Sequence, residues 1–284
     1  MPELPEVTTT VTDLKKNIIG FKIKDVWFDY KRNIKFSDLL IGKKVLEVKR
    51  KGKNILVYLS SGYLMLIHQK MSGHLLVGKW KLVEKKWVPI KKDEISLDRV
   101  NNYIHFLITF SNGKMLALSD LRKFAKVLVG KTEEIENLKE LKSLGLDPFD
   151  KELTEKKFSE LIQSKKGNIK KVLMDQTVVS GVGNIYADEI LFASRVSPIR
   201  KIDSLNKSEI SKIYINMREI LKLAIKERGT SVSDFRDSEG KPGNFVNFLK
   251  VYGKKKGKCV GCQSDIKTIK MGGRTAHYCP KCQQ

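Results

Sequence analysis

The cysteines of this 284-residue chain place the tightest constraint on its fold, because all four lie within the last 26 residues. They are spaced as Cys259-x2-Cys262, sixteen intervening residues, then Cys279-x2-Cys282. Each close pair can offer two thiolates from one tight knuckle, which is the spacing of four-thiolate zinc sites. Four unrelated buried thiols would not need paired spacing, and a redox disulfide would need only one pair. We therefore predict one structural zinc ion with four cysteine ligands, which folds a hairpin rather than taking part in chemistry.

The hydrophobic periodicity changes twice along the chain. Residues 3–19 read as a short helix, and residues 21–129 show the short alternating runs of an antiparallel β-sandwich or barrel. The pattern is helical after residue 130, and residues 229–250 hold few periodic apolar positions, as a mobile loop would. We predict an α+β fold with a β-sandwich domain at 1–130, a helical domain at 131–228, a loop and connection at 229–250 and a zinc finger at 251–284.

The charge of the chain favours a polyanionic partner. Lys and Arg number 55 against 32 Asp and Glu, a net charge of +23. A Lys-rich composition alone could explain this excess, and a membrane surface is a second polyanion. The sequence has no run of eighteen apolar residues and no signal-peptide pattern, so we expect a cytoplasmic, nucleoid-associated protein that binds nucleic acid and no membrane.

The first residues, MPELPEV, crowd two prolines and two glutamates into a helix start. Pro5 suits the first turn, and Glu3 suits the positive end of the helix dipole, so a capped helix is a sufficient explanation by itself. Beside the cysteine pattern, however, this stretch resembles the N-terminus of the formamidopyrimidine-DNA glycosylases, whose mature chain begins at the proline after methionine removal.

The resemblance continues in order along nearly the whole chain. The segments that carry it are HQKMSG at 68–73, DLRKF at 120–124, LMD at 173–175 followed by GVGNIYA at 181–187, VYG at 251–253 and GGRT at 272–275. They resemble, respectively, the family's wedge-methionine turn, its arginine and phenylalanine loop, its helix-two-turns-helix DNA-binding motif and the residues that flank and enter its zinc finger.

The resemblance implies a catalytic set of four residues. A secondary amine is a good nucleophile when neutral, and an N-terminal amine has an ordinary pKa near 8, so Pro2 suits this role once Met1 is removed. The family attacks the sugar C1′ with this amine, forms a Schiff base and cuts the strand by β- and δ-elimination. Glu3 matches its general acid/base, Lys53 the proton donor in β-elimination and Arg274 the residue of δ-elimination that clamps phosphate. From the sequence alone, Lys53 and Arg274 would more often be solvated surface charges.

The resemblance also implies contacts with double-stranded DNA. Met71, Arg122 and Phe124 match the trio that fills the void left by an everted base, with Arg122 facing the orphaned cytosine. Asn184 precedes a helix, where it could hold a phosphate or simply cap the helix. The remaining expected backbone contacts are His68, His105, Lys165 and Tyr252. His105 could equally be an ordinary strand residue.

Residues 229–247 resemble the loop that closes over an everted oxidised purine. The expected function is therefore removal of 8-oxoguanine and formamidopyrimidines by a monomeric glycosylase and lyase of DNA repair. Ala125 and Asn244 depart from the family's common glycine and aromatic residue, which bears on lesion preference and loop closure. The alternatives are the related endonuclease VIII type, which acts on oxidised pyrimidines, and a non-catalytic zinc-finger DNA-binding protein.

Overall fold

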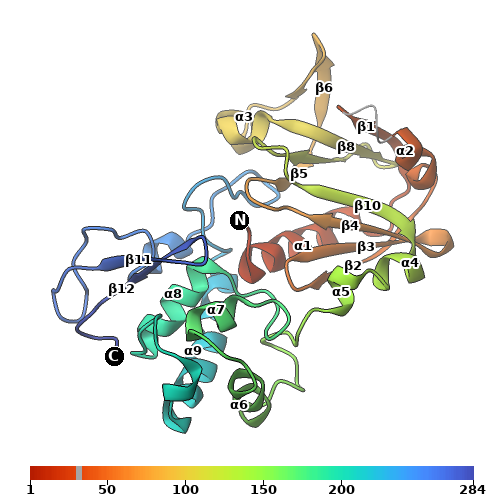
Figure 1. The fold of residues 1–284 in the computed structure, drawn as a ribbon. Helices are drawn as coiled ribbons and strands as arrows, with labels where there is room; N and C mark the ends of the chain where they lie inside the picture. Colours follow the sequence, from red (N-terminus) through yellow and green to blue (C-terminus); the bar gives the residue numbers. More distant parts are fainter. Residues whose placement is uncertain (30–33) are drawn as a thin grey trace. The chain divides into compact units, whose positions relative to one another are not determined.

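The computed structural model describes residues 1–29 and 34–284. By the contacts among these residues, the chain divides into two compact units (Figure 1). The first unit comprises Met1–Lys142 and Glu227–Asn244, and the second comprises Ser143–Lys226 and Phe245–Gln284.

The first unit opens on helix α1 (Leu4–Ile18) and continues mainly as strands. Its strands are β1 (Ile23–Phe28), β2 (Val45–Lys51), β3 (Asn54–Leu59), β4 (Tyr63–His68), β5 (His74–Gly78), β6 (Trp80–Val83), β7 (Lys86–Pro89), β8 (Ile104–Phe110), β9 (Met115–Ser119) and β10 (Lys126–Lys131). Its short helices are α2 (Ile34–Leu40), α3 (Glu94–Leu97), α4 (Thr132–Glu136) and α5 (Lys139–Lys142), with 3-10 turns η2 (Ser60–Gly62) and η3 (Arg99–Asn102).

Two four-stranded antiparallel sheets form the predicted β-sandwich. Their strand orders are β1-β8-β9-β5 and β10-β4-β3-β2. Both sheets contribute to one apolar core, which α1 joins through Val7, Val11, Leu14 and Ile18. These four residues recur at helical spacing and therefore share one face of α1, which explains why the helix docks on the sandwich rather than standing in solvent.

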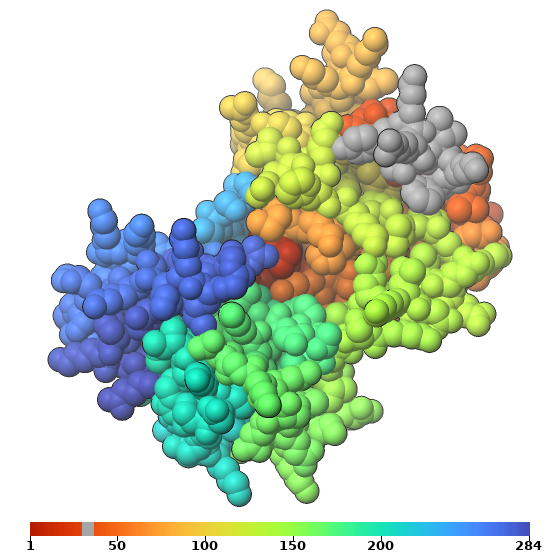
Figure 2. Space-filling model, in the orientation of Figure 1, coloured from red at the N-terminus to blue at the C-terminus, as the bar shows by residue number. Residues whose placement is uncertain are grey.

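A hairpin and a small second core follow β5, and the sequence pattern did not predict them. Within residues 1–29 and 34–284, strands β6 and β7 pair only with each other, and the hairpin that they form projects from the first unit (Figures 1 and 2). Trp80 and Ile95 pack with Ile104 in a cluster apart from the main core. This cluster fixes the segment that contains α3 and η3.

The second unit holds the helices and the cysteine-rich hairpin. Its elements are α6 (Glu155–Gln163), α7 (Ile169–Met174), α8 (Asn184–Ala193), η4 (Ile202–Ser204), α9 (Lys207–Lys226), η5 (Phe245–Phe248), β11 (Lys267–Met271) and β12 (Arg274–Tyr278). Helix α8 contacts α7, α9 and β12, and is buried along most of its length. The helical pattern, the two helices around residues 169–193 and the terminal hairpin agree with the prediction.

The predicted loop, residues 229–250, contains no α-helix or strand, but its last part is not wholly irregular, because the 3-10 turn η5 lies within it. None of the helices in the described parts of the chain combines the length and the apolar run needed to cross a membrane.

Candidate functional site

The start of α1 buries Pro2 and Glu3 together. Glu3 is the N-cap and exchanges hydrogen bonds with Glu6 in a capping box, in which the backbone N–H of Glu3 donates to Glu6 Oε2 at 2.7 Å. Reciprocal capping satisfies helix N–H groups that would otherwise lack partners, so it fixes the chain direction at the first turn. Removal of Met1 would convert the Pro2 nitrogen from an amide into a secondary amine at this fixed position.

The start of the 229–244 segment lies against Glu6. The backbone N–H of Thr230 donates to Glu6 Oε1 at 2.7 Å. Gly229 has φ +83°, and a Cβ there would lie 2.8 Å from Glu6 Oε1, so no other residue fits without displacing this carboxylate. The Glu6 side chain thus links the backbone of Glu3 to the start of the 229–244 segment. The spacing of residues along the helix did not predict this link.

Lys53 and His68 share one end of the β2-β3-β4 sheet. Lys53 is only 7% exposed, in the turn that joins β2 to β3. His68 ends β4, and burial together with the nearby charges of Lys70 and Lys53 lowers the pKa of His68 to about 4. At neutral pH this histidine is therefore uncharged, so a phosphate contact from it would be a neutral hydrogen bond.

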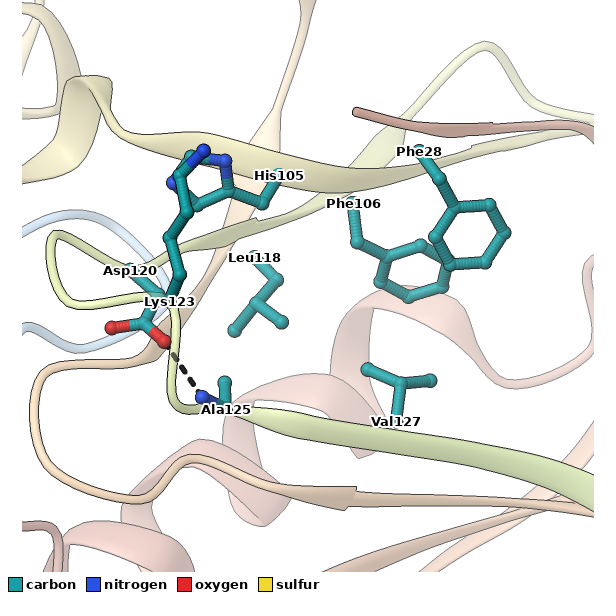
Figure 3. A pocket seen from close by; sticks show the side chains of 8 residues that line it. All are labelled: Phe28, His105, Phe106, Leu118, Asp120, Lys123, Ala125 and Val127. Atoms are coloured by element: carbon teal, nitrogen blue, oxygen red, sulfur yellow. Dashed lines mark hydrogen bonds between the residues drawn. The ribbon is translucent and has the colours of Figure 1, made fainter. Parts of the chain in front are cut away.

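Asp120 joins the two segments predicted to fill the DNA void. One oxygen accepts from Ser72 Oγ at 2.5 Å and from the Arg122 N–H at 3.2 Å, and the other accepts from the Ala125 N–H at 2.7 Å (Figure 3). Asp120 is 1% exposed, whereas Phe124, in the loop that it ties, is 54% exposed. The tie therefore presents this apolar ring to solvent. Asp120 begins the DLRKF motif at 120–124, but the motif alone does not indicate this structural role.

Arg122 and Phe124 also contact each other, with the guanidinium 5.0 Å from the ring centre. Met71, the third member of the predicted trio, is half-buried in the turn before Ser72. The structure thus brings together, in the first unit, the turn at 68–73 that carries Met71 and the loop at 120–124 that carries Arg122 and Phe124.

His105 lies in β8 at the rim of a cavity of about 60 Å³ (Figure 3). Its Nδ1 contacts the carboxylate of Asp29, which also pairs with Lys123 Nζ at 3.2 Å. The stacked rings of Phe28 and Phe106, 4.6 Å apart, line the apolar side of the cavity. Sequence reasoning missed Asp29, because no local pattern links it to a residue 76 positions away.

The remaining predicted DNA contacts belong to the second unit. Asn184 is the first residue of α8, directly after Gly183. Its side-chain oxygen is buried and has no hydrogen-bond partner among the described residues. Lys165 follows α6, and the Tyr252 ring lies 5.0 Å from that of His277.

The four cysteines converge as predicted. Their sulfur atoms all lie within 4.8 Å of one another, with 3.4 Å between Cys262 and Cys279 and 3.8 Å between Cys259 and Cys282. Thiolates on a tetrahedral zinc ion at about 2.3 Å lie roughly 3.8 Å apart, so the donor set fits this metal. Backbone N–H groups point at the sulfurs, as from Gly261 to Cys259 at 3.4 Å. Arg274 begins β12 and is exposed.

A buried ion cluster joins the hairpin to the helices. Lys170 Nζ lies 2.6 Å from Asp188 Oδ1 and donates to the Thr275 carbonyl at 3.1 Å. The other oxygen of Asp188 accepts from the His277 backbone N–H at 2.9 Å. Beside it, Glu189 accepts three backbone N–H bonds from residues 250–252. No sequence pattern predicted this cluster, because a lysine within a helix is usually solvated.

Known proteins resemble both units of the chain. Two family models match, the formamidopyrimidine-DNA glycosylase N-terminal domain over residues 1–127 and the formamidopyrimidine-DNA glycosylase H2TH domain over residues 144–236. The chain is 34% identical to the formamidopyrimidine-DNA glycosylase of Pelotomaculum thermopropionicum and 35% identical to that of Bacillus cereus, in each case over 100% of this chain and 99% of the relative.

Solved structures agree. The Lactococcus lactis enzyme in a complex with DNA that contains an abasic site superposes with a TM-score of 0.84 at 31% identity, over 99% of each chain. The protein from Thermus thermophilus gives a TM-score of 0.83 at 29% identity, over 99% of this chain and 98% of that one.

Proposed function

The chain belongs to the formamidopyrimidine-DNA glycosylase family, and from this premise we propose that it is a bifunctional DNA glycosylase and abasic-site lyase of base-excision repair. The proposed substrates are oxidised purines in double-stranded DNA, among them 8-oxoguanine and formamidopyrimidines. The observation that carries the proposal is the buried start of α1, where the capping box of Glu3 and Glu6 fixes the residue that follows Pro2.

Pro2 is the proposed nucleophile. With Met1 removed, its neutral amine attacks C1′ of the damaged nucleotide, and the glycosidic bond breaks with its electron pair leaving on the base. Opening of the sugar ring then gives an iminium between the proline nitrogen and C1′. Glu3, held at the N-cap, donates the proton that the ring oxygen takes up in this step.

Strand cleavage follows from the acidity of the iminium. Loss of the C2′ proton expels the 3′ phosphate, and a second elimination expels the 5′ phosphate. Lys53 is the proposed proton donor of the first elimination, and its burial in the β2-β3 turn supports a fixed position. Arg274 is the proposed phosphate clamp of the second, since its planar fork suits two phosphate oxygens.

The proposed DNA contacts divide by role. Met71, Arg122 and Phe124 fill the void in the base stack. The hydrogen bonds of buried Asp120 support this role, because they hold the turn at 68–73 and the loop at 120–124 in one arrangement. Backbone contacts are proposed for His68, His105, Lys165, Asn184 and Tyr252. When bound, zinc at Cys259, Cys262, Cys279 and Cys282 supplies folding free energy to the hairpin that carries Arg274.

We propose that the functional domains have the boundaries predicted from the sequence. A catalytic β-sandwich domain at 1–130 and a helix-two-turns-helix domain at 131–228 are joined by a lesion-capping loop and connection at 229–250, and a zinc finger occupies 251–284. We propose a cytoplasmic, nucleoid-associated monomer.

Borohydride trapping on a duplex with 8-oxoguanine opposite cytosine tests the proposal. Borohydride reduces an iminium, so wild-type protein lacking Met1 should give a covalent DNA adduct that maps to Pro2. Pro2→Gly should give a much weaker adduct, and Glu3→Gln should slow base release. No adduct, with Met1 removed and DNA binding intact, would favour the alternative of a non-catalytic DNA-binding protein.

The choice of lesion class has its own test. The endonuclease VIII type acts on oxidised pyrimidines with the same chemistry. The Arg122 loop and the 229–247 loop favour a purine enzyme, so excision from 8-oxoguanine duplexes should exceed excision from thymine glycol duplexes.

A further inference from the structure

The segment Glu227–Asn244 is fastened to the first unit by charged contacts at its base. Arg228 Nη2 lies 2.6 Å from Asp13 Oδ2 and 2.8 Å from Asp237 Oδ2, and Ser238 Oγ donates to Asp13 at 3.1 Å. The carboxylates of Asp13 and Asp237 are 9% and 3% exposed. Arg228 has φ +60°, a conformation that costs energy for any residue with a Cβ and persists where surrounding contacts impose it.

A second fastening lies farther along the segment. Arg236 Nε donates to Asp98 Oδ2 at 2.6 Å, while the Arg236 Nη1 donates to the carbonyls of Ser233 and Phe235 at 2.9 and 2.7 Å. The other oxygen of Asp98 accepts from the Val100 N–H at 3.1 Å. Arg236 thus joins residues 233–236 of the segment to the start of η3.

The third fastening is at Gly240. Asn101 is fully buried and donates through Nδ2 to the carbonyls of Gly240 and Glu94 at 3.4 and 3.3 Å. Since both partners are acceptors, the amide orientation is set, and its oxygen faces His74 Nε2 at 2.9 Å. Gly240 has φ +84°, and a Cβ there would lie 3.0 Å from the Cα of Ile95, so the segment is seated closely on α3.

These fastenings leave one part of the segment open. The side chain of Val232 is 50% exposed, two residues after the Thr230 N–H that binds Glu6. An exposed apolar side chain two residues from this contact is suited to lie against the face of a planar base.

We propose that the contacts of Asp98 with Arg236 and of Asn101 with Gly240, together the loop latch, hold this segment in a preset arrangement that determines how well the enzyme excises an intact damaged base. The inference rests on the proposed function. A loop that is ordered before substrate arrives loses less conformational freedom on binding, so the latch raises the population competent for excision. A nucleotide without a base offers nothing for Val232 to cover, so cleavage of abasic DNA does not depend on the latch.

The experiment compares two substrates with the same set of variants. Asp98→Asn keeps the acceptor for Val100 but removes the charge that holds Arg236, and Arg236→Gln removes the other partner. We expect each variant to slow single-turnover excision of 8-oxoguanine by roughly tenfold, the effect of losing a charged hydrogen bond. Cleavage of an abasic duplex should change less than twofold by the same rough scale, and the double variant should be no slower than the single ones.

A matched control lies in the same segment. Lys241 and Glu239 form an exposed ion pair, with side chains 51% and 67% accessible, outside the latch. Lys241→Gln removes a charge of the same sign from the same loop and should leave both rates unchanged. Amide hydrogen exchange gives a second readout, because the latch variants should speed exchange at 231–240 and leave α1 as protected as in the wild type.

The outcomes separate the two proposals. Equal slowing on both substrates, no slowing on either, or unchanged exchange at 231–240 would overturn the latch. A wild-type protein that cleaves neither substrate and gives no borohydride adduct would remove the proposed function, and the latch with it.

Discussion

The side-chain carboxylate of Glu6 lies 2.7 Å from the backbone nitrogen of Glu3 and accepts its hydrogen bond. Its second oxygen accepts from Thr230 at the same distance. A carboxylate has two acceptor oxygens and an amide has one, so the helix start and the loop base depend on a single ionisable side chain.

Glu6→Gln should therefore weaken both contacts at once. One of the two N–H groups would face an amide NH2, and a buried donor without an acceptor costs about 1–3 kcal/mol. We expect base excision and abasic-site cleavage to slow together by roughly tenfold or more. Single-turnover rates on both substrates measure this, with Glu47→Gln at an exposed ion pair as the control. Slowing of base excision alone would mean that Glu6 acts only through the loop.

The pH dependence of stability should carry a signature of His68. Burial first, then Lys70 and Lys53, lowers its pKa from 6.5 to about 4, so the unfolded chain binds a proton in this window that the folded chain does not. Stability from this group is present above pH 6.5 and is lost as the pH falls toward 4, by on the order of 3 kcal/mol in total. Denaturant titrations at several pH values should show a flatter acid limb for His68→Gln.

A second variant tests the cause of this shift. Lys70→Gln removes one of the charges that lower the pKa of His68, so an NMR titration of the imidazole should move upward. An unchanged titration would show that the charge of Lys70 does not contribute to the lowered pKa of His68.

Loss of Lys170 should strongly destabilise the second unit. Its partner Asp188 has a fully buried side chain, and removal of one member of a buried pair typically costs about 3–5 kcal/mol. Lys170→Met should lower the urea midpoint accordingly. Adding Asp188→Asn should recover part of the loss, because it removes the unpaired buried charge while the amide oxygen can still accept from the His277 N–H. Lys171→Met, at an exposed position of α7, should stay within about 0.5 kcal/mol of wild type. A double variant less stable than Lys170→Met would contradict this account.

Removal of the metal should unfold the terminal hairpin. Cys262→Ser replaces one of four thiolates, and a structural zinc site contributes its binding free energy to folding. We expect loss of bound zinc, measured by atomic absorption, and a fall in DNA affinity of at least about tenfold, with a shallower salt dependence because phosphate contacts are lost. Lys281→Gln, between the two cysteines of the second pair, should keep the metal and change affinity only slightly. Full DNA affinity without zinc would contradict the prediction.

Local patterns predicted the parts of the fold that depend on local physics. The spacing of Val7, Val11, Leu14 and Ile18 marks the buried face of α1, and the paired cysteines specify their own convergence. The β6-β7 hairpin was not predicted, because its turn residues, Glu84 and Lys85, adopt positive φ without the glycine or asparagine that usually marks such a turn.

The contacts that sequence reasoning missed are long-range and polar. Asp98 and Arg236 are 138 positions apart, and no apolar period or local spacing links the one to the other. The same holds for Asp29 with His105 and for Lys170 with Asp188. Ion pairs of this kind are set by how the elements pack, which periodicity does not encode.

The ties between α8 and the cysteine hairpin bear on how such a protein can be recombined. Asp188 holds β12, and the neighbouring Glu189 captures the backbone of residues 250–252. The cysteine hairpin therefore cannot be exchanged between relatives as an independent module. A chimaera that takes residues 253–284 from a relative inherits a docking surface made for another helix, whereas a graft that carries α7 and α8 with the hairpin transfers a complete unit.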